Sequence, residues 1–119
     1  MNRKKILCAD DEMAIRLLVS EELKEEGYVV YTAANGREAL NIIEEVPLDL
    51  VILDIKMPEM DGIEALRQIK ARYPDLPVVF FTGYGEYKQD FATWASDDYC
   101  VKSSDLSDLF FAIKRHCRD

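Results

Sequence analysis

The sequence predicts a single α/β domain in which helices cover both faces of a five-stranded parallel sheet. Five short apolar segments alternate with five segments whose apolar residues recur at helical spacing, a pattern typical of parallel strands joined by helices. The third apolar segment, residues 50–53, is an unbroken run of branched side chains, as expected for a strand buried on both faces. A chain of 119 residues is long enough for one hydrophobic core and too short for two.

The five predicted strands are bounded by charged or turn-forming residues. The first ends at an acidic pair, and the fourth begins beside Pro77, where a missing backbone N–H is tolerated. The second is rich in β-branched and aromatic residues, which favour strands. The predicted ranges are 5–9, 28–32, 50–53, 78–81 and 99–101.

The five predicted helices are delimited by capping and helix-breaking residues. Gly27 ends the first helix, Pro47 the second and Pro74 the third. Asn35, with Glu38 three residues later, resembles a capping box at the start of the second helix. For the other helix boundaries, Asp61 and Glu64 cap the third helix, the fourth spans residues 86–96, and the fifth follows Ser104 or Asp105 and carries Leu106, Leu109, Phe110, Ile113 and Cys117 on one face.

The composition excludes several classes of function. The chain has 23 acidic and 15 basic side chains, a net charge of −8 and no basic stripe, so neither nucleic acid nor an anionic membrane is an expected direct partner. No apolar run approaches the roughly 20 residues that a membrane span needs, and no signal peptide is recognisable, so we expect a cytoplasmic location. Three cysteines without C-x-x-C spacing indicate packing residues rather than a disulfide framework or a zinc site.

Every predicted strand except the second is followed by, or ends in, a polar functional group. These are Asp10 and Asp11, Asp54, Thr82 and Lys102. Because the carboxyl ends of parallel strands share one edge of a sheet, these residues are expected to converge although more than ninety positions separate the first from the last. Clustered carboxylates repel one another unless they bind a cation, and Mg²⁺ prefers such oxygen ligands. Each residue alone could be a helix cap, a turn former or a solvated charge, but together they predict a site.

An aspartate beside Mg²⁺ can act as a nucleophile towards phosphorus and form an acyl phosphate. In such a site a lysine such as Lys102 would hold one phosphoryl oxygen, and the hydroxyl of Thr82 could hydrogen-bond another. Gly83, next to Thr82, leaves room for the transferred group. The residues therefore indicate chemistry on phosphoryl groups.

The sequence resembles the receiver domains of two-component response regulators, and the resemblance covers essentially the whole chain. The matching residues are Asp10-Asp11, the block DIKMPEMDG from Asp54 to Gly62, the block TGYGE from Thr82 to Glu86, and the block DYCVK from Asp98 to Lys102. The resemblance implies a flavodoxin-like, doubly wound sheet, and the strand order 2-1-3-4-5 follows from the resemblance rather than from periodicity. It also implies that residues 1–119 are a single receiver domain without an output domain.

The resemblance further implies the roles of the site residues. Asp54 would accept a phosphoryl group from a phosphohistidine on a sensor histidine kinase or a phosphotransfer protein. Asp11, Asp54 and the backbone carbonyl of Lys56 would bind Mg²⁺, and Asp10 would bind it mainly through water. The protein would be a signalling switch that catalyses its own phosphorylation and dephosphorylation, not a turnover enzyme.

Signal output is also implied by the resemblance. Thr82 and Lys102 would contact the phosphoryl oxygens, and Tyr99 would be the switch aromatic whose movement accompanies that of Thr82. The surface made by the helix 86–96, the strand 99–101 and the last helix would then change, and through it the protein would regulate an effector protein or output domain or form a homodimer. Tyr84, Tyr87, Trp94 and Phe111 are candidate partner contacts on this surface, and Lys56 and Tyr84 are candidates for limiting water attack on the phosphorylated aspartate.

One departure from the family pattern and three alternative functions stay open. Ser103 follows Lys102 where the family usually has a proline, often with a cis bond, which before serine would cost roughly 2.5–4 kcal/mol. A receiver-like interaction module that is not phosphorylated is therefore one alternative. A Mg²⁺-dependent phosphatase would need a D-x-D motif after the first strand, and a flavodoxin-like cofactor binder would need a Ser/Thr/Gly-rich loop there, and Asp10-Asp11-Glu12 matches neither.

Overall fold

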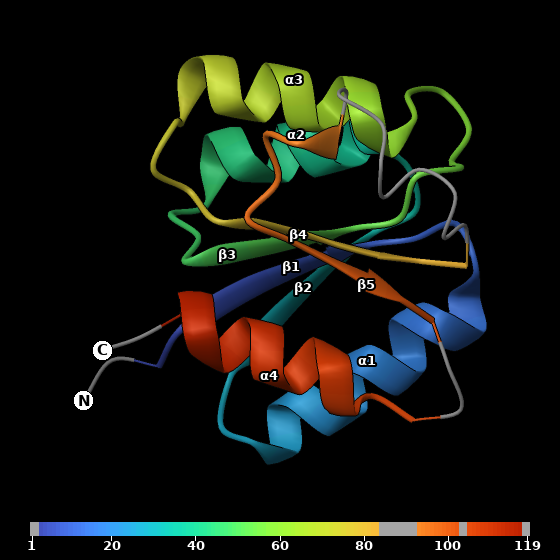
Figure 1. Ribbon diagram of the computed structural model, residues 1–119, viewed down its shortest axis with the longest axis vertical. Coiled ribbons are helices and arrows are strands. Elements are labelled where there is room, and N and C mark those ends of the chain that lie inside the picture. Colours follow the sequence, from blue (N-terminus) through green and yellow to red (C-terminus); the bar gives the residue numbers. More distant parts are fainter. Residues whose placement is uncertain (1–2, 84–92, 103–104, 118–119) are drawn as a thin grey trace.

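The computed structural model describes residues 3–83, 93–102 and 105–117, which form a parallel sheet with helices on both faces (Figure 1). The strands are β1 Lys5–Ala9, β2 Val29–Ala33, β3 Leu50–Leu53, β4 Val78–Thr82 and β5 Asp98–Val101. The helices are α1 Met13–Glu25, α2 Gly36–Glu45, α3 Gly62–Arg72 and α4 Ser107–His116. None of the helices in these ranges is long and apolar enough to cross a membrane.

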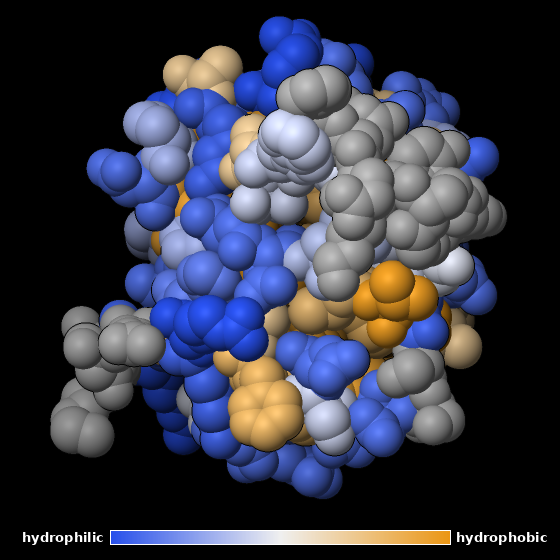
Figure 2. Space-filling view, in the orientation of Figure 1, coloured by the Kyte–Doolittle hydropathy of each residue, from blue (hydrophilic) through white to orange (hydrophobic). Residues whose placement is uncertain are grey.

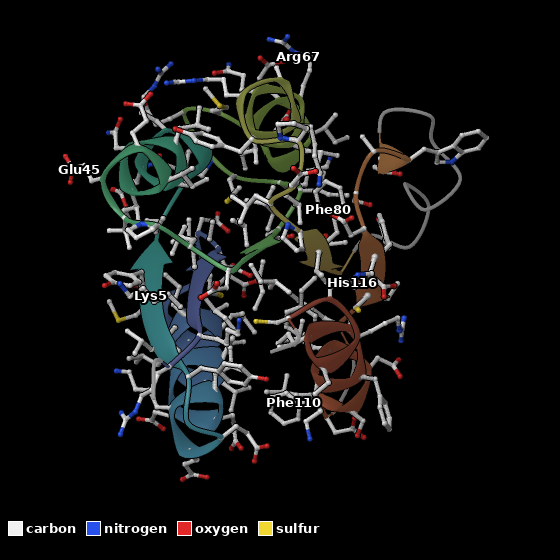
Figure 3. The ribbon with its side chains drawn as sticks, turned by 90° about the vertical axis from the view of Figure 1, so that its left-hand side faces the viewer. Lys5, Glu45, Arg67, Phe80, Phe110 and His116 are labelled. Carbon is white, nitrogen blue, oxygen red and sulfur yellow. The ribbon has the colours of Figure 1, made fainter. Side chains whose placement is uncertain are left out.

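The sheet has five parallel strands in the order β2-β1-β3-β4-β5, which confirms the predicted topology. Helices α2 and α3 cover one face, and α1 and α4 cover the other (Figures 1 and 3). The register aligns Ala9 of β1 with Leu53 of β3, and Thr82 of β4 with Val101 of β5. The strands therefore end close to one another at their carboxyl edge, where the predicted site residues follow.

Alternate residues along each strand belong to different hydrophobic clusters. Leu7, Leu53 and Phe80 pack towards α2 and α3, whereas Cys8 and Phe81 pack towards α1 and α4. This alternation is the two-residue period of a strand, applied to a sheet that is buried on both faces. It explains why residues 50–53 can be apolar without interruption, because both of their faces are covered.

Two helices begin at the caps that the sequence predicts. The Asn35 side chain accepts a hydrogen bond from the Glu38 N–H at 2.9 Å, and the Asp61 side chain accepts one from the Glu64 N–H, also at 2.9 Å. The Glu38 carboxylate returns to the N–H of Ala34 rather than to that of Asn35, so the capping box is displaced by one residue. These caps satisfy N–H groups that have no partner inside the helix.

Two expectations about helices need correction. Four helices, not five, are present in the described part of the chain; most of the helix expected at 86–96 lies outside it, and the described end, residues 93–96, is a turn in which the N–H of Ser96 donates to the carbonyl of Thr93. The last helix has Leu106 as its N-cap rather than Ser104 or Asp105. Asp105 instead accepts a hydrogen bond from the Ser107 N–H at 2.9 Å, so it forms a turn just before the helix.

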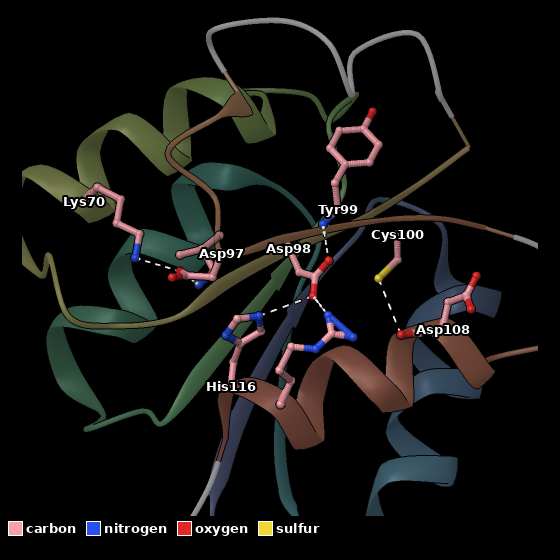
Figure 4. Close-up of polar contacts among 9 residues, drawn as sticks. Lys70, Asp97, Asp98, Tyr99, Cys100, Asp108 and His116 are labelled. Atoms are coloured by element: carbon pink, nitrogen blue, oxygen red, sulfur yellow. Dashed lines mark hydrogen bonds and ion pairs between the residues drawn. The ribbon is translucent and has the colours of Figure 1, made fainter.

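Two aspartates hold the beginning of β5 in place (Figure 4). The Asp97 carboxylate accepts hydrogen bonds from the Lys70 ammonium and from the Val78 N–H, both at 2.8 Å, and so ties α3 to the start of β4. Asp98 pairs with Arg115 at 2.6 Å, and the His116 ring nitrogen lies 3.3 Å from the same oxygen. The edge strand is thus connected to a helix on each face of the sheet.

Cys8 and Cys100 are buried in the hydrophobic cluster beneath α1 and α4, and the half-buried Cys117 packs against it, which confirms the predicted packing roles. Burial raises the pKa of the Cys8 thiol from 9.0 to about 12, with a smaller contribution from the charge of Asp10. The Cys8 thiol is consequently a poor nucleophile in the folded protein.

The raised Cys8 pKa predicts a loss of stability at alkaline pH. Above pH 9.0 the unfolded chain releases the thiol proton while the folded chain retains it up to about pH 12, so the free energy of unfolding should fall as the pH rises through this window. The expected slope from this group is about 1.4 kcal/mol per pH unit, measured by urea unfolding of the native protein against Cys8→Ala. Equal slopes in the two proteins would contradict the assignment.

Candidate functional site

The carboxyl edge of the sheet brings Asp10 and Asp54 together, as predicted. Asp10 follows the last residue of β1 and Asp54 the last residue of β3, two strands that are paired in register. The Asp54 N–H donates to the carbonyl of Ala9 at 3.0 Å, which continues the sheet by one step. Both carboxylates are almost fully buried, with 1% of Asp10 and 4% of Asp54 exposed.

Lys102 extends from the end of β5 to these carboxylates and is their positive partner. Its ammonium lies 2.8 Å from Asp10 Oδ2, 3.1 Å from Asp54 Oδ2 and 3.4 Å from Glu12 Oε1. To reach them, the side chain passes the end of β4, where its ammonium lies 5.9 Å from the centre of the Phe81 ring. The lysine therefore connects the edge strand β5 with the ends of β1 and β3, two of the three interior strands.

The pKa values of Asp10 and Lys102 are both raised, for different reasons. Burial raises the pKa of the Asp10 carboxyl, and the hydrogen bond from Lys102 opposes the rise without cancelling it. Burial acts against the charged form of Lys102, but the hydrogen bond to Asp10 and the charge of Asp54 outweigh it and raise the lysine pKa. The ammonium is consequently charged at any physiological pH.

The Asp54 carboxylate is oriented by its own backbone neighbour. Asp54 Oδ1 accepts a hydrogen bond from the Ile55 N–H at 2.8 Å, and this leaves Oδ2 on the side of Lys102. Gly62 packs directly on the Asp54 backbone, because a Cβ built at Gly62 would lie 2.0 Å from the Asp54 carbonyl oxygen. The Gly62 N–H also donates to the carbonyl of Ile55 at 2.8 Å, so the first turn of α3 holds the loop after β3 against the site.

The loop between β1 and α1 contributes a third carboxylate, that of Glu12, which was not predicted from the sequence. One carboxylate oxygen each from Asp10, Glu12 and Asp54 lies within 4.8 Å of the others. Glu12 enters this group because its N–H donates to Asp10 Oδ1 at 2.9 Å and it precedes the first residue of α1. The only indication in the sequence is that Glu12 is a third acidic residue directly after Asp10 and Asp11.

The donor set suits a hard divalent cation. Three carboxylate oxygens in one cluster, two of them from buried side chains, are the ligand type that Mg²⁺ prefers. Asp11 is exposed and lines the same pocket as Glu12 and Asp54, but it is not one of the three clustered carboxylates. The residues present therefore fit a magnesium ion.

A pocket of about 510 Å³ opens above these groups, enough for a metal ion, its waters and a phosphoryl group. Its lining residues are Asp11, Glu12, Asp54, Lys56, Gly83 and Lys102. Lys56 is exposed, and within the described ranges a Cβ at Gly83 would meet no atom within 4 Å. Thr82 is fully buried at the end of β4, one residue before the pocket-lining glycine.

Tyr99 lies on β5 and is half-buried against the α2 and α3 side of the sheet. Its ring centroid is 5.6 Å from that of Phe80. In Figure 4 the ring points away from the Asp98 and His116 contacts. The aromatic residue that the resemblance names as a switch is thus packed on a core residue of the neighbouring strand.

The surface around β5 and α4 exposes several apolar side chains. Trp94 is 60% exposed, Phe111 66% and Val101 39%. Figure 2 shows orange side chains over β5 and α4 among blue hydrophilic ones. Tyr84, Tyr87 and the Lys102-Ser103 peptide bond, about which the sequence raised specific expectations, lie outside the described residues.

Comparison with known proteins places the chain in a family. A family model described as the response regulator receiver domain matches residues 6–114. Sporulation initiation phosphotransferase F of Bacillus subtilis is 37% identical over 118 residues, which are 98% of this chain and 95% of that protein. The regulatory protein AtoC of Escherichia coli is 34% identical over 113 residues, which are 93% of this chain but 24% of that protein. The chain thus spans nearly all of the first relative and about a quarter of the second.

Solved structures agree with this assignment. The response regulator protein TrrA from Thermotoga maritima, in complex with Mg²⁺-BeF, has a TM-score of 0.91 and 44% sequence identity, covering 94% of this chain and 97% of that one. The structure of the histidine kinase ThkA in complex with TrrA matches with a TM-score of 0.91 and 43% identity, covering 97% of this chain and 99% of that one. The chain therefore belongs to the family of response regulator receiver domains.

Proposed function

We propose that this protein is a phosphorylation-dependent signalling switch in which Asp54 accepts a phosphoryl group from a phosphohistidine. The donor would be a sensor histidine kinase or a phosphotransfer protein, as the complex between ThkA and TrrA supports for a relative. The observation that carries the proposal is the position of Asp54, a buried carboxylate with one oxygen accepting a hydrogen bond from the Ile55 N–H and the other facing Lys102 in an open pocket. The switch would act in the cytoplasm, as a receiver domain formed by residues 1–119.

The transfer is a displacement at phosphorus. An Asp54 oxygen attacks, the bond between phosphorus and the imidazole nitrogen breaks, and the electron pair returns to the imidazole, leaving an acyl phosphate on Asp54. The Ile55 N–H holds Oδ1 in place, which supports Oδ2 as the attacking atom. Each transfer uses up the free carboxylate until hydrolysis restores it, so the protein is a switch and not a turnover enzyme.

Lys102 and Thr82 stabilise the transferred group. The Lys102 ammonium, 3.1 Å from Asp54 Oδ2, is within reach of a phosphoryl oxygen on that atom. Thr82, at the end of the neighbouring strand, offers its hydroxyl to a second oxygen. Asp11, Asp54 and the Lys56 carbonyl, with Asp10 and Glu12 beside them, would hold Mg²⁺, which would supply charge neutralisation; the Mg²⁺-BeF complex of the relative TrrA supports such a site.

Output passes from the pocket to the surface around β5. Tyr99 lies three residues before Lys102 on the same strand and packs on Phe80, so a displacement of β5 at its carboxyl end alters the packing of the ring. The change is a charge event that biases a two-state packing arrangement. The exposed Phe111 and Trp94 lie on the surface that would bind an effector protein, an output domain or a second copy of the chain.

The proposal is tested by intact mass spectrometry after incubation with Mg²⁺ and a small-molecule phosphodonor. The native protein should gain a single phosphoryl group, and Asp54→Asn should gain none, because the amide is not a nucleophile towards phosphorus. Asp75→Asn, which removes an exposed carboxylate outside the site, is the matched control and should still be phosphorylated.

Trp94 fluorescence in the same samples reports whether the signal reaches the output surface. A change that requires both Mg²⁺ and Asp54 is expected. If the native protein binds Mg²⁺ but gains no mass, the proposal is wrong and the unphosphorylated interaction module is the better assignment.

A further inference from the structure

Arg16 holds the acidic loop between β1 and α1 from outside the pocket. Its guanidinium Nη1 donates to the backbone carbonyl of Asp10 at 2.7 Å, across six positions of sequence. The side chain is half-buried and is not among the residues that line the pocket. The contact therefore joins the first helix to the backbone of a site residue without touching the place where a ligand would lie.

With the hydrogen bond from Arg16, every polar group of Asp10 has a partner. The Asp10 N–H donates to the Ala33 carbonyl at 3.0 Å, Oδ1 accepts the Glu12 N–H at 2.9 Å, and Oδ2 accepts Lys102 at 2.8 Å. Arg16 occupies the remaining polar group, the carbonyl oxygen. Because the peptide bond is planar, holding this carbonyl also fixes the orientation of the peptide that leads to the next residue of the loop.

The loop needs such an anchor because its three consecutive residues are all acidic. Asp10, Asp11 and Glu12 lie beside a fourth carboxylate, that of Asp54, and carboxylates at this spacing repel one another. Within the described part of the chain, Lys102 forms ion pairs with two of the three loop residues, Asp10 and Glu12. A hydrogen bond from a charged donor to the loop backbone opposes the repulsion without occupying any of the carboxylate oxygens.

We propose that Arg16 is a positioning residue that holds the Asp10-Asp11-Glu12 loop in the orientation that binds the divalent cation. The inference rests on the proposed function, because it concerns the cation of that same site. Interactions one step removed from a metal typically contribute about 10- to 100-fold to metal affinity. For a single bond to the loop backbone we expect the lower end of this range.

The sign of the effect separates positioning from simple electrostatics. The guanidinium is positive and close to the cation site, so removal of its charge alone would tighten the binding of Mg²⁺. Loss of positioning would weaken it. Replacement of Arg16 by an uncharged side chain of similar length therefore gives opposite results under the two explanations.

The experiment compares the Mg²⁺ affinity of the full chain with that of Arg16→Met and Arg16→Lys by calorimetry without phosphodonor. We expect Arg16→Met to bind Mg²⁺ about tenfold more weakly. Arg16→Lys keeps a charged donor and should recover part of the loss. Lys24→Met, which removes an exposed positive charge from the last turn of the same helix, is the control and should bind as the native protein does.

A second readout works without metal. The amide resonances of Asp11 and Glu12 should shift in Arg16→Met, while urea unfolding tests that the variant remains folded. Equal or tighter Mg²⁺ binding in folded Arg16→Met would overturn the inference, as would unchanged loop resonances. If the native protein itself fails to bind Mg²⁺, the proposed function is wrong, and the metal-free resonances still decide whether Arg16 orients the loop.

Discussion

Replacement of Lys102 by methionine is expected to destabilise the metal-free protein by about 2–3 kcal/mol at neutral pH, because it leaves two buried carboxylates without their positive partner. The side chains of Asp10 and Asp54 are only 2% and 5% exposed, so water would compensate only in part for the loss of the ammonium. The loss should be smaller in acid. The Asp10 pKa is already raised, and without the lysine the carboxyl should protonate at still higher pH, which removes the unpaired charge.

Urea unfolding in the presence of a chelator measures this effect, and addition of Mg²⁺ should restore much of the lost stability, because the cation then supplies the missing positive charge. Lys114→Met is the matched control. Its ammonium is 3.9 Å from Glu26 and its side chain is 65% exposed, so its removal should change the free energy of unfolding by less than about 0.5 kcal/mol. A Lys102→Met protein as stable as the native one at neutral pH would show that the carboxylates do not depend on Lys102.

The exchange of Gly62 for alanine should cost about 3 kcal/mol of stability. In an ordinary helix this exchange is favourable, since alanine restricts the unfolded chain and has a better helix propensity. At Gly62 the added Cβ would lie 2.0 Å from the carbonyl oxygen of Asp54 and 3.0 Å from Cα of Ile55, both backbone atoms that no side-chain rotation can move aside. Either α3 or the Asp54 backbone must shift, and a shift of the Asp54 backbone would displace the carboxylate that we propose as the phosphoacceptor.

Gly62→Ala is best measured against Gly83→Ala, since a Cβ at Gly83 meets no atom of the described residues within 4 Å. The free energies of unfolding of the two variants, measured in urea, should therefore differ by nearly the whole loss expected for Gly62→Ala. The initial rate of phosphorylation should also fall in Gly62→Ala. Equal stability of the two variants would mean that the loop after β3 can relax away from α3 at little cost.

The convergence of the site could be predicted from the sequence because it follows from the sheet alone. Parallel strands in register end at one edge, so Asp10, Asp54, Thr82 and Lys102 needed only correct strand ends to be placed together. The contacts of Lys102 with both buried aspartates confirm that part of the prediction. Which role each residue has in phosphoryl transfer stays a prediction until the phosphorylation experiment is done.

Other features were beyond sequence reasoning because they depend on loop geometry. Glu12 joins the carboxylate cluster through a hydrogen bond between its own N–H and Asp10, and Arg16 reaches back six residues to a backbone oxygen. Neither contact has a periodic signal. The start of the last helix was predicted wrongly because Asp105 is as suitable for a turn as for a cap, and the structure uses it for the turn.

Lys102 links two strands that are held in the sheet to different degrees. Asp54 follows a strand with neighbours on both sides and helices on both faces, whereas Lys102 follows β5, which has a neighbour on one side only. If Asp54 is phosphorylated as proposed, the new charge would act through Lys102 on an edge strand, whereas β3, which Asp54 follows, is an interior strand. Because the beginning of β5 is tied to α3 and α4, we expect any displacement to be largest near the pocket, where a partner bound to the exposed side of β5 would sense it.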